Sequence, residues 1–280
     1  MTQTPRVAVI QMVSSDDVQE NLRVAGDWIA RAAKDGVGLV VLPENFAVLD
    51  SGPVRVHGER QGDPLAPLQR FLSGQAREHG IYLVGGTIPL LTRPGPEGTV
   101  LDDGRVRPAS LLYGPDGQLL ARYDKMHLFD VEVADAQSRY RESDTFEAGT
   151  EVVVADLPMV TVGMSVCYDL RFAELYRRLA GDRAELVTVP SAFTRVTGEA
   201  HWEVLLRARA IENQVYILAP NQGGRHNATR ETWGHSMIVD PWGRVLACHE
   251  HGEGMAVADI DLRALHELRA RMPVMQHRKL

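Results

Sequence analysis

Short runs of Val, Ile and Leu alternate with amphipathic stretches along most of the chain, and this alternation restricts the possible folds more than any other feature. Val7–Met12 and Leu39–Leu42 are typical of buried strands. In the intervening segment 16–34, apolar residues recur at steps of four and three, the period of a helix with one face against a core. A second helix is predicted over 64–79 and a further strand over 81–87. This order predicts βαβ units, and therefore an α/β protein whose helices cover its sheets.

The two halves of the chain contain similar elements in the same order. Residues 110–121 match residues 236–247 at every apolar position, and both segments have the Pro-x-Gly turn of a β-hairpin. Two pairs of strand-like runs also correspond: Val7–Met12 with Val162–Val166, and Leu39–Pro43 with Leu186–Pro190. Chance similarity is the alternative, since such hairpins are common. We predict two mixed sheets related by pseudo-symmetry and stacked as an α-β-β-α sandwich.

No linker or shift in composition divides the chain, which predicts one domain over residues 1–280. Residues 93–107, rich in Pro, Gly and charge, are predicted to form a surface loop. The net charge is −7 and no block of Lys and Arg occurs, which argues against nucleic acid or an anionic membrane as the main partner. No apolar stretch approaches the roughly 18–20 residues that span a bilayer, and the N-terminus has no apolar region of signal-peptide length.

The two cysteines belong to no C-x-x-C pair, so neither a disulfide framework nor a cysteine-based zinc site is expected. His201 and Glu203 do not form the H-E-x-x-H pattern of zinc hydrolases, and no glycine pair has the spacing of a phosphate loop. We therefore expect a cytoplasmic protein that holds no metal and no cofactor and binds a small molecule.

Cys167 lies where a predicted strand, residues 161–166, meets a predicted helix that begins near Leu170. The N-terminus of a helix lowers the pKa of a thiol, and its free N–H groups can stabilise an oxyanion, so this position suits a nucleophile. The alternative is a small core residue, since free cysteines are usually buried. Cys248 is predicted at the end of a hairpin strand, where we expect a structural role.

Two charged residues also follow predicted strands. Glu44 comes after a buried strand, and Lys125 comes directly after the first hairpin. Together with Cys167 they supply a carboxylate to accept the thiol proton, a cation to stabilise an oxyanion and a thiol to attack a carbonyl. Glu142 is a candidate for orienting the lysine or a water molecule. The alternative for each charged group, taken singly, is a solvated surface position.

The segments around these residues resemble the signature motifs of the nitrilase, or carbon–nitrogen hydrolase, superfamily. The resemblance rests on three ordered motifs: Leu42-Pro-Glu44, Tyr123-Asp-Lys125-Met-His-Leu-Phe-Asp130 and Gly163-Met-Ser-Val-Cys167-Tyr-Asp-Leu-Arg171-Phe172. It implies an α-β-β-α sandwich that assembles into a four-layer homodimer or a higher oligomer. It also implies a Glu–Lys–Cys triad at Glu44, Lys125 and Cys167, with Glu142 matching the family's second glutamate.

The C-terminal third is similar to the branch of this superfamily that contains deaminated glutathione amidases and omega-amidases. The similarity is carried by residues 190–212, 222–226 and 273–278. It implies a cofactor-free amidase that forms a cysteine thioester and hydrolyses a small 2-oxo acid amide, foremost deaminated glutathione, to 2-oxoglutarate and cysteinylglycine. The alternatives are 2-oxoglutaramate or another small amide or carbamoyl compound as substrate and, in a different class, an inactive interaction module.

A substrate of this kind is negatively charged, so we expect cations around the thiol. Three arginines are candidates for binding the carboxylate groups, with a plain surface position as the alternative for each: Arg171, Arg195 and Arg225. Two residues of the segment that carries the resemblance are further candidates for the pocket: Phe193 and Thr197. The oxyanion is expected between Lys125 and the backbone N–H of Tyr168.

Overall fold

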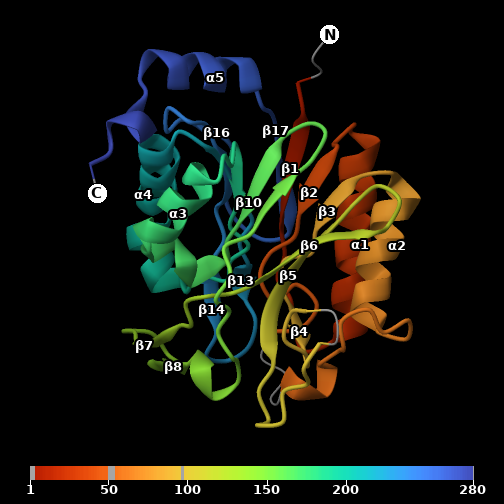
Figure 1. Cartoon of the computed structure of the whole chain (residues 1–280). Helices are drawn as coiled ribbons and strands as arrows, with labels where there is room; N and C mark the ends of the chain where they lie inside the picture. Colours follow the sequence, from red (N-terminus) through yellow and green to blue (C-terminus); the bar gives the residue numbers. More distant parts are fainter. Residues whose placement is uncertain (1–3, 50–53, 96–97, 280) are drawn as a thin grey trace.

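The computed structural model describes residues 4–49, 54–95 and 98–279. Two β-sheets are stacked between two pairs of helices (Figure 1). The helices of the first sheet are α1 (Val18–Lys34) and α2 (Pro67–His79), and those of the second are α3 (Ala173–Gly181) and α4 (Arg195–Asn213). A fifth helix, α5 (Leu262–Arg271), lies at one end of the sandwich. The predicted α-β-β-α architecture is confirmed.

The first sheet contains seven strands. Its order is β17–β1–β2–β3–β5–β4, and β6 pairs with β5. The bounds are β1 (Arg6–Gln11), β2 (Leu39–Val41), β3 (Tyr82–Val84), β4 (Ile88–Leu90), β5 (Arg107–Tyr113), β6 (Leu119–Asp124) and β17 (Gly254–Asp259).

The second sheet contains six strands in the order β16–β15–β12–β11–β10–β9. The bounds are β9 (Val154–Asp156), β10 (Thr161–Met164), β11 (Leu186–Thr188), β12 (Tyr216–Ala219), β15 (Ser236–Val239) and β16 (Val245–His249). Strands β1, β2 and β3 are parallel, as are β10, β11 and β12, and each set continues into an antiparallel hairpin, β5–β6 or β15–β16. The predicted pseudo-symmetry of the two halves is thus confirmed.

Strand β1 shows how the layers are held together. Val7 and Val9 belong to the core between the two sheets, whereas Ala8 and Ile10 belong to the core under α1 and α2. Successive side chains of a strand point to opposite faces, so an uninterrupted apolar run is what a strand covered on both faces requires. This burial anchors the strands, and their carboxyl ends hold the loops of the site.

The strand predicted over residues 81–87 is shorter in the structure, where it is β3 and ends at Val84. A separate strand, β4, follows it. The chain bends at Gly86, which has a φ of +49°, and a Cβ atom there would lie 2.0 Å from the carbonyl oxygen of Pro43. Only glycine allows this approach of two backbones. Of the predicted loop 93–107, residues 96 and 97 lie outside the described residues, and its last residue, Arg107, already begins β5.

Two small hairpins lie at the same end of the sandwich (Figure 1). They are β7 (Asp130–Glu132) with β8 (Arg139–Arg141), and β13 (Gly223–Arg225) with β14 (Glu231–Trp233). Four 3-10 helices complete the described elements: η1 (Val54–His57), η2 (Glu142–Asp144), η3 (Cys167–Arg171) and η4 (Val274–His277). No helix in the described part of the chain has the length and apolar composition needed to cross a membrane.

Candidate active site

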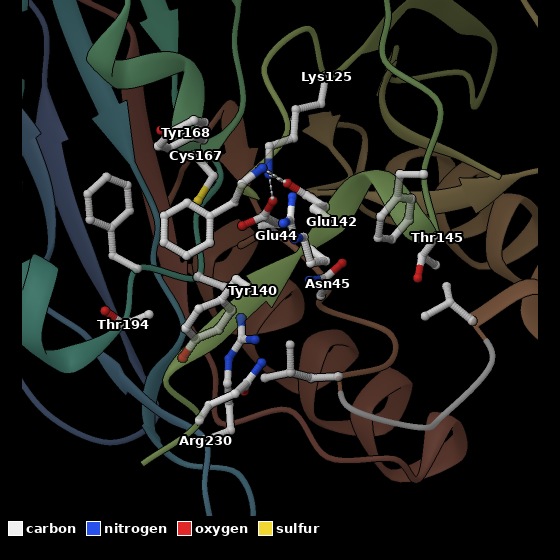
Figure 2. A pocket seen from close by; sticks show the side chains of 18 of the residues that line it. Glu44, Asn45, Lys125, Tyr140, Glu142, Thr145, Cys167, Tyr168, Thr194 and Arg230 are labelled. Atoms are coloured by element: carbon white, nitrogen blue, oxygen red, sulfur yellow. Dashed lines mark hydrogen bonds and ion pairs between the residues drawn. The ribbon is translucent and has the colours of Figure 1, made fainter. Parts of the chain in front are cut away.

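The ends of three strands bring the predicted catalytic groups together. Glu44 follows β2 and Lys125 follows β6 in the first sheet, while Cys167 follows β10 in the second. The Nζ atom of Lys125 lies 2.8 Å from Glu44 Oε1 and 2.8 Å from each carboxylate oxygen of Glu142 (Figure 2). Cys167 lines the same cavity as these three side chains, and the nearby charge of Glu44 helps to raise the pKa of its thiol. The four side chains therefore form one cluster at the junction of the two sheets.

The backbone of Glu44 is held from both sheets. The bend at Gly86 packs against Pro43, just before the glutamate. Asn45, just after it, has a φ of 57° and its N–H donates to Thr87 Oγ1 at 2.9 Å. From the second half of the chain, Gln222 Nε2 donates to the carbonyl oxygen of Glu44 at 3.1 Å. The carboxylate thus extends from a rigid turn toward the thiol.

Cys167 occupies a sharp turn between β10 and α3. Its φ of 50° is rare for a residue with a side chain, and it begins the 3-10 helix η3. The predicted strand-to-helix junction is therefore present, although α3 itself begins six residues later, at Ala173. Such strain persists where the surrounding structure enforces it, and it is frequent at functional sites.

Asp169, which our sequence analysis did not single out, enforces this turn. Its buried carboxylate accepts hydrogen bonds from the N–H of Val166 at 2.9 Å, from Tyr123 Oη at 2.6 Å and from the N–H of His127 at 3.0 Å. It therefore ties the nucleophile turn to the segment that carries Lys125. The only sign of this role in the sequence is that Asp169 lies two residues after the cysteine. An acidic residue at that position does not by itself show in which direction its side chain points.

The ammonium of Lys125 is fully buried and is held by opposite charges. Burial alone lowers the pKa of a lysine, but here the carboxylates of Glu142 and Glu44 outweigh that effect and raise the pKa of Lys125 well above its ordinary value. The burial of Glu142 raises the pKa of that carboxyl group, against the opposing effect of Lys125. Lys125 is consequently a permanent cation.

The surroundings of Cys167 act on its thiol in the opposite direction from a helix N-terminus. A helix N-terminus lowers the pKa of a thiol, whereas burial, reinforced by the charge of Glu44, raises the pKa of Cys167 well above its usual value, and Lys125 only partly opposes this. The helical segment at this position is a single five-residue 3-10 turn, which contributes little dipole. The resting thiol keeps its proton and requires a base, and Glu44 is in place to be that base.

A cavity of about 360 Å³ opens over this cluster. Four residues of the predicted binding set line it: Tyr168, Arg171, Phe193 and Thr197. The guanidinium carbon of Arg171 lies 5.7 Å from the ring centre of Tyr168 and 5.4 Å from that of Phe193. This arginine is thereby held beside the nucleophile turn.

Two predicted arginines lie outside the cavity lining. Arg195 is half exposed and forms ion pairs with Glu199 at 3.5 Å and Glu231 at 3.6 Å. Arg225 is exposed, and its guanidinium donates to the carbonyl oxygens of Asn227 and Ala228 at 3.1 Å. Both are surface arginines with local partners, so the structure does not support their assignment to substrate binding.

Other residues that sequence reasoning missed do line the cavity. The most informative are polar or aromatic groups of the two small hairpins and their flanks: Phe129, Tyr140, Arg141 and Arg230. Phe129 belongs to the motif around Lys125, but no motif marks the other three, because they reach the cavity only through the folding of hairpins that are distant in sequence. Arg230 lies on the turn that links β13 to β14, five residues after Arg225.

Among the described residues, one group has side chains of metal-ligand type close together. Ligand atoms of His235, Glu250 and His251 lie within 4.8 Å of one another. None of the three lines the cavity, so this group has no part in the cluster around Cys167.

An α-β-β-α sandwich with a buried thiol beside a carboxylate and an ammonium defines a class of protein: a hydrolase that cleaves carbon–nitrogen bonds. The sequence pattern of the family described as carbon-nitrogen hydrolase matches residues 6–270. The chain belongs to this family, and it is an amidase.

Similar proteins agree with this assignment. The chain is 43% identical over 274 residues to deaminated glutathione amidase from Yersinia enterocolitica, covering 98% of this chain and 92% of the relative. It is 37% identical over 280 residues to omega-amidase NIT2-B from Xenopus laevis, covering 98% and 95%. The crystal structure of Nit3 from Saccharomyces cerevisiae, a member of branch 10 of the nitrilase superfamily, superposes with a TM-score of 0.86 at 32% identity, covering 99% and 97%. The predicted superfamily, fold class and amidase activity are confirmed.

Proposed function

We propose that this amidase hydrolyses deaminated glutathione to 2-oxoglutarate and cysteinylglycine. The observation that carries the proposal is a single cavity that combines the Glu44–Lys125–Cys167 cluster with arginine side chains. The first feature suits attack on an amide, and the second suits an anionic substrate. Relatives named deaminated glutathione amidase, 40–43% identical, support the choice of substrate.

The first half of the reaction forms a thioester. Glu44 accepts the proton of Cys167 as the sulfur attacks the amide carbon, because burial keeps the resting thiol protonated and this carboxylate lines the same cavity beside it. Negative charge develops on the carbonyl oxygen, and Lys125 Nζ and the backbone N–H of Tyr168 stabilise it. The C–N bond then breaks, and the leaving amine takes the proton back from Glu44.

The second half hydrolyses the thioester. Glu44 removes a proton from a water molecule that attacks the thioester carbon, and Lys125 and Tyr168 again stabilise the oxyanion. The C–S bond breaks, the acid is released, and the proton on Glu44 returns to the Cys167 sulfur. Throughout, Glu142 keeps Lys125 in place through two contacts of 2.8 Å.

The 2-oxo acid part of the substrate has its place beside Arg171. A guanidinium can bind a carboxylate through two parallel hydrogen bonds, and the aromatic rings of Tyr168 and Phe193 hold it in position. Thr197, also in the lining, supplies a hydroxyl near the same wall.

The test is a comparison of kcat/KM for deaminated glutathione and 2-oxoglutaramate, with mass spectrometry of the protein during turnover. A 2-oxoglutaryl adduct on Cys167 and a higher kcat/KM for deaminated glutathione are expected. The second candidate function is that of an omega-amidase, which the similarity to NIT2-B favours. A higher kcat/KM for 2-oxoglutaramate would select that function instead.

We further infer that the chain forms a homodimer in a reducing compartment such as the cytoplasm, where a catalytic thiol stays reduced. Large apolar side chains are exposed on and beside α4: Val204, Ile211 and Trp242. A second copy that covers this face would remove them from water. Light scattering coupled to gel filtration measures the mass, and a Val204→Glu variant is expected to shift it from two chains to one.

A further inference from the structure

The end of the cavity away from the thiol carries a cation that the chemistry above does not use. Arg230 is half-buried, and its guanidinium carbon lies 5.3 Å from the ring centre of Tyr140. Figure 2 shows the two side chains together, at the opposite end of the pocket from the Lys125–Glu44 contact. An arginine stacked on an aromatic ring has its N–H donors oriented in one plane, which suits a carboxylate.

An aromatic wall joins this arginine to the nucleophile turn. The ring centres of Tyr140 and Phe129 are 5.1 Å apart, and those of Phe129 and Tyr168 are also 5.1 Å apart. Tyr168 directly follows Cys167. Arg230 and the nucleophile therefore lie at the two ends of one continuous wall.

The hairpin turn that carries Arg230 is well defined. Asn227 Oδ1 accepts hydrogen bonds from the N–H of Thr229 at 2.8 Å and from the N–H of Arg230 at 2.7 Å. This Asx-type turn sets the direction in which the chain leaves toward β14. Arg225, at the other side of the same turn, is kept outside the cavity.

Two of the three arginines that line the cavity thus lie at different distances from the nucleophile turn. Arg171 is held against Tyr168, next to the nucleophile, whereas Arg230 is separated from Tyr168 by two further rings. Such an arrangement suits a substrate with a carboxylate on each side of the scissile bond. Deaminated glutathione is such a molecule, because its leaving group ends in the glycine carboxylate, whereas the leaving group of 2-oxoglutaramate is ammonia.

We propose that Arg230 forms a leaving-group subsite that binds the terminal carboxylate of cysteinylglycine, and that it sets the preference for a dipeptide amide over a primary amide. This inference rests on the function proposed above. Two extended residues span about 7 Å, so the glycine carboxylate reaches past Tyr168 along the aromatic wall, toward Tyr140 and Arg230.

The test compares Arg230→Gln with wild type on three substrates. These are deaminated glutathione, its glycinamide analogue, in which the terminal carboxylate is a neutral amide, and 2-oxoglutaramate. For deaminated glutathione, Arg230→Gln is expected to lower kcat/KM by about 10-fold or more, mostly through KM, since a charge-assisted pair is lost. For 2-oxoglutaramate the change is expected to stay within about 2-fold. Arg225→Gln is the matched control on the same hairpin and should change neither value.

The glycinamide analogue makes the test specific for the carboxylate. Wild type should cleave it about 10-fold less efficiently than the acid, and Arg230→Gln should cleave both forms equally well. Equal losses on all three substrates, or no loss on deaminated glutathione, would overturn the assignment of Arg230 and leave the proposed function standing. Failure of the wild type to cleave deaminated glutathione would overturn both proposals.

Discussion

The two ends of the cavity hold their charges in different ways. At the inner end, Lys125 is buried and contacts two carboxylates at 2.8 Å. Two arginines of the cavity wall are half-buried and rest against aromatic rings: Arg171 beside the nucleophile turn and Arg230 at the far end. We refer to these two arginines together as the outer end. A cation held between two buried carboxylates is fixed in one orientation, which suits a transition state, whereas half-buried arginines on an open wall suit an anion that arrives and leaves. We therefore expect changes at the inner end to act on kcat and changes at the outer end to act on KM.

The largest expected effect is that of Cys167→Ala at the inner end. Without a nucleophile no thioester forms, and kcat should fall on the order of 10⁴-fold or more. An assay of deaminated glutathione hydrolysis that monitors the release of 2-oxoglutarate measures this kcat. Cys248→Ala is the matched control, since Cys248 is exposed in β16 and outside the cavity, and it should keep kcat within about 2-fold. Appreciable turnover in Cys167→Ala would exclude the proposed nucleophile.

Lys125→Met should damage both catalysis and stability. The loss of the oxyanion donor should lower kcat by about 10²–10³-fold. The change also leaves Glu44 and Glu142 buried without their cation, which should lower the free energy of unfolding by about 3–5 kcal/mol. Urea denaturation and steady-state kinetics measure the two effects.

A double variant separates these two consequences. Lys125→Met combined with Glu142→Gln removes one of the two buried negative charges, so part of the lost stability should return while kcat stays low. If the double variant regained activity together with stability, Lys125 would be a structural residue and the comparison between the two ends would fail.

The inner end was largely predictable from the sequence, whereas the outer end was predictable only in part, since Arg171 was a candidate and Arg230 was not. Glu44, Lys125 and Cys167 each follow an apolar strand, but these strands belong to two sheets, so the strand pattern alone left other positions open for each residue. The resemblance to three ordered signature motifs was what assigned the three residues to one site. Arg225 and Arg230 lie on one hairpin, and only the folded turn decides which of them lines the cavity. The direction of the pKa shift of Cys167 could not be deduced from the sequence either, because burial and the charge of Glu44 arise from tertiary packing rather than from position in the chain.

Glu142→Gln tests how the inner end responds to pH. Burial raises the pKa of Glu142 above that of an ordinary glutamate, so as pH falls it takes up a proton early and Lys125 loses one carboxylate partner. Wild-type kcat should therefore begin to fall on the acidic side at a pH above the usual glutamate range. In Glu142→Gln this step is absent, so the acidic limb should move to lower pH while the plateau value drops by about 10-fold.

Measurement of kcat from about pH 4.5 to pH 8 for wild type and Glu142→Gln shows whether Glu142 causes the acidic limb. Glu199→Gln, an exposed glutamate outside the cavity, is the control and should leave the profile unchanged. An acidic limb in the same place for wild type and Glu142→Gln would assign it to another group.

The smallest of these effects, at the outer end, is expected for Arg171→Met. The substitution keeps an apolar side chain beside Tyr168 and Phe193 but removes the guanidinium that we propose to bind the 2-oxo acid carboxylate, so KM should rise by about 10-fold while kcat at saturation changes less than about 3-fold. Unlike Arg230→Gln, it should act on both substrates, because deaminated glutathione and 2-oxoglutaramate share the 2-oxo acid part. Arg195→Met, which lies outside the lining, is the control. A fall in kcat with an unchanged KM would show that Arg171 acts on the transition state, as the residues of the inner end do. The proposal that Arg171 binds the acyl part of the substrate would then be wrong.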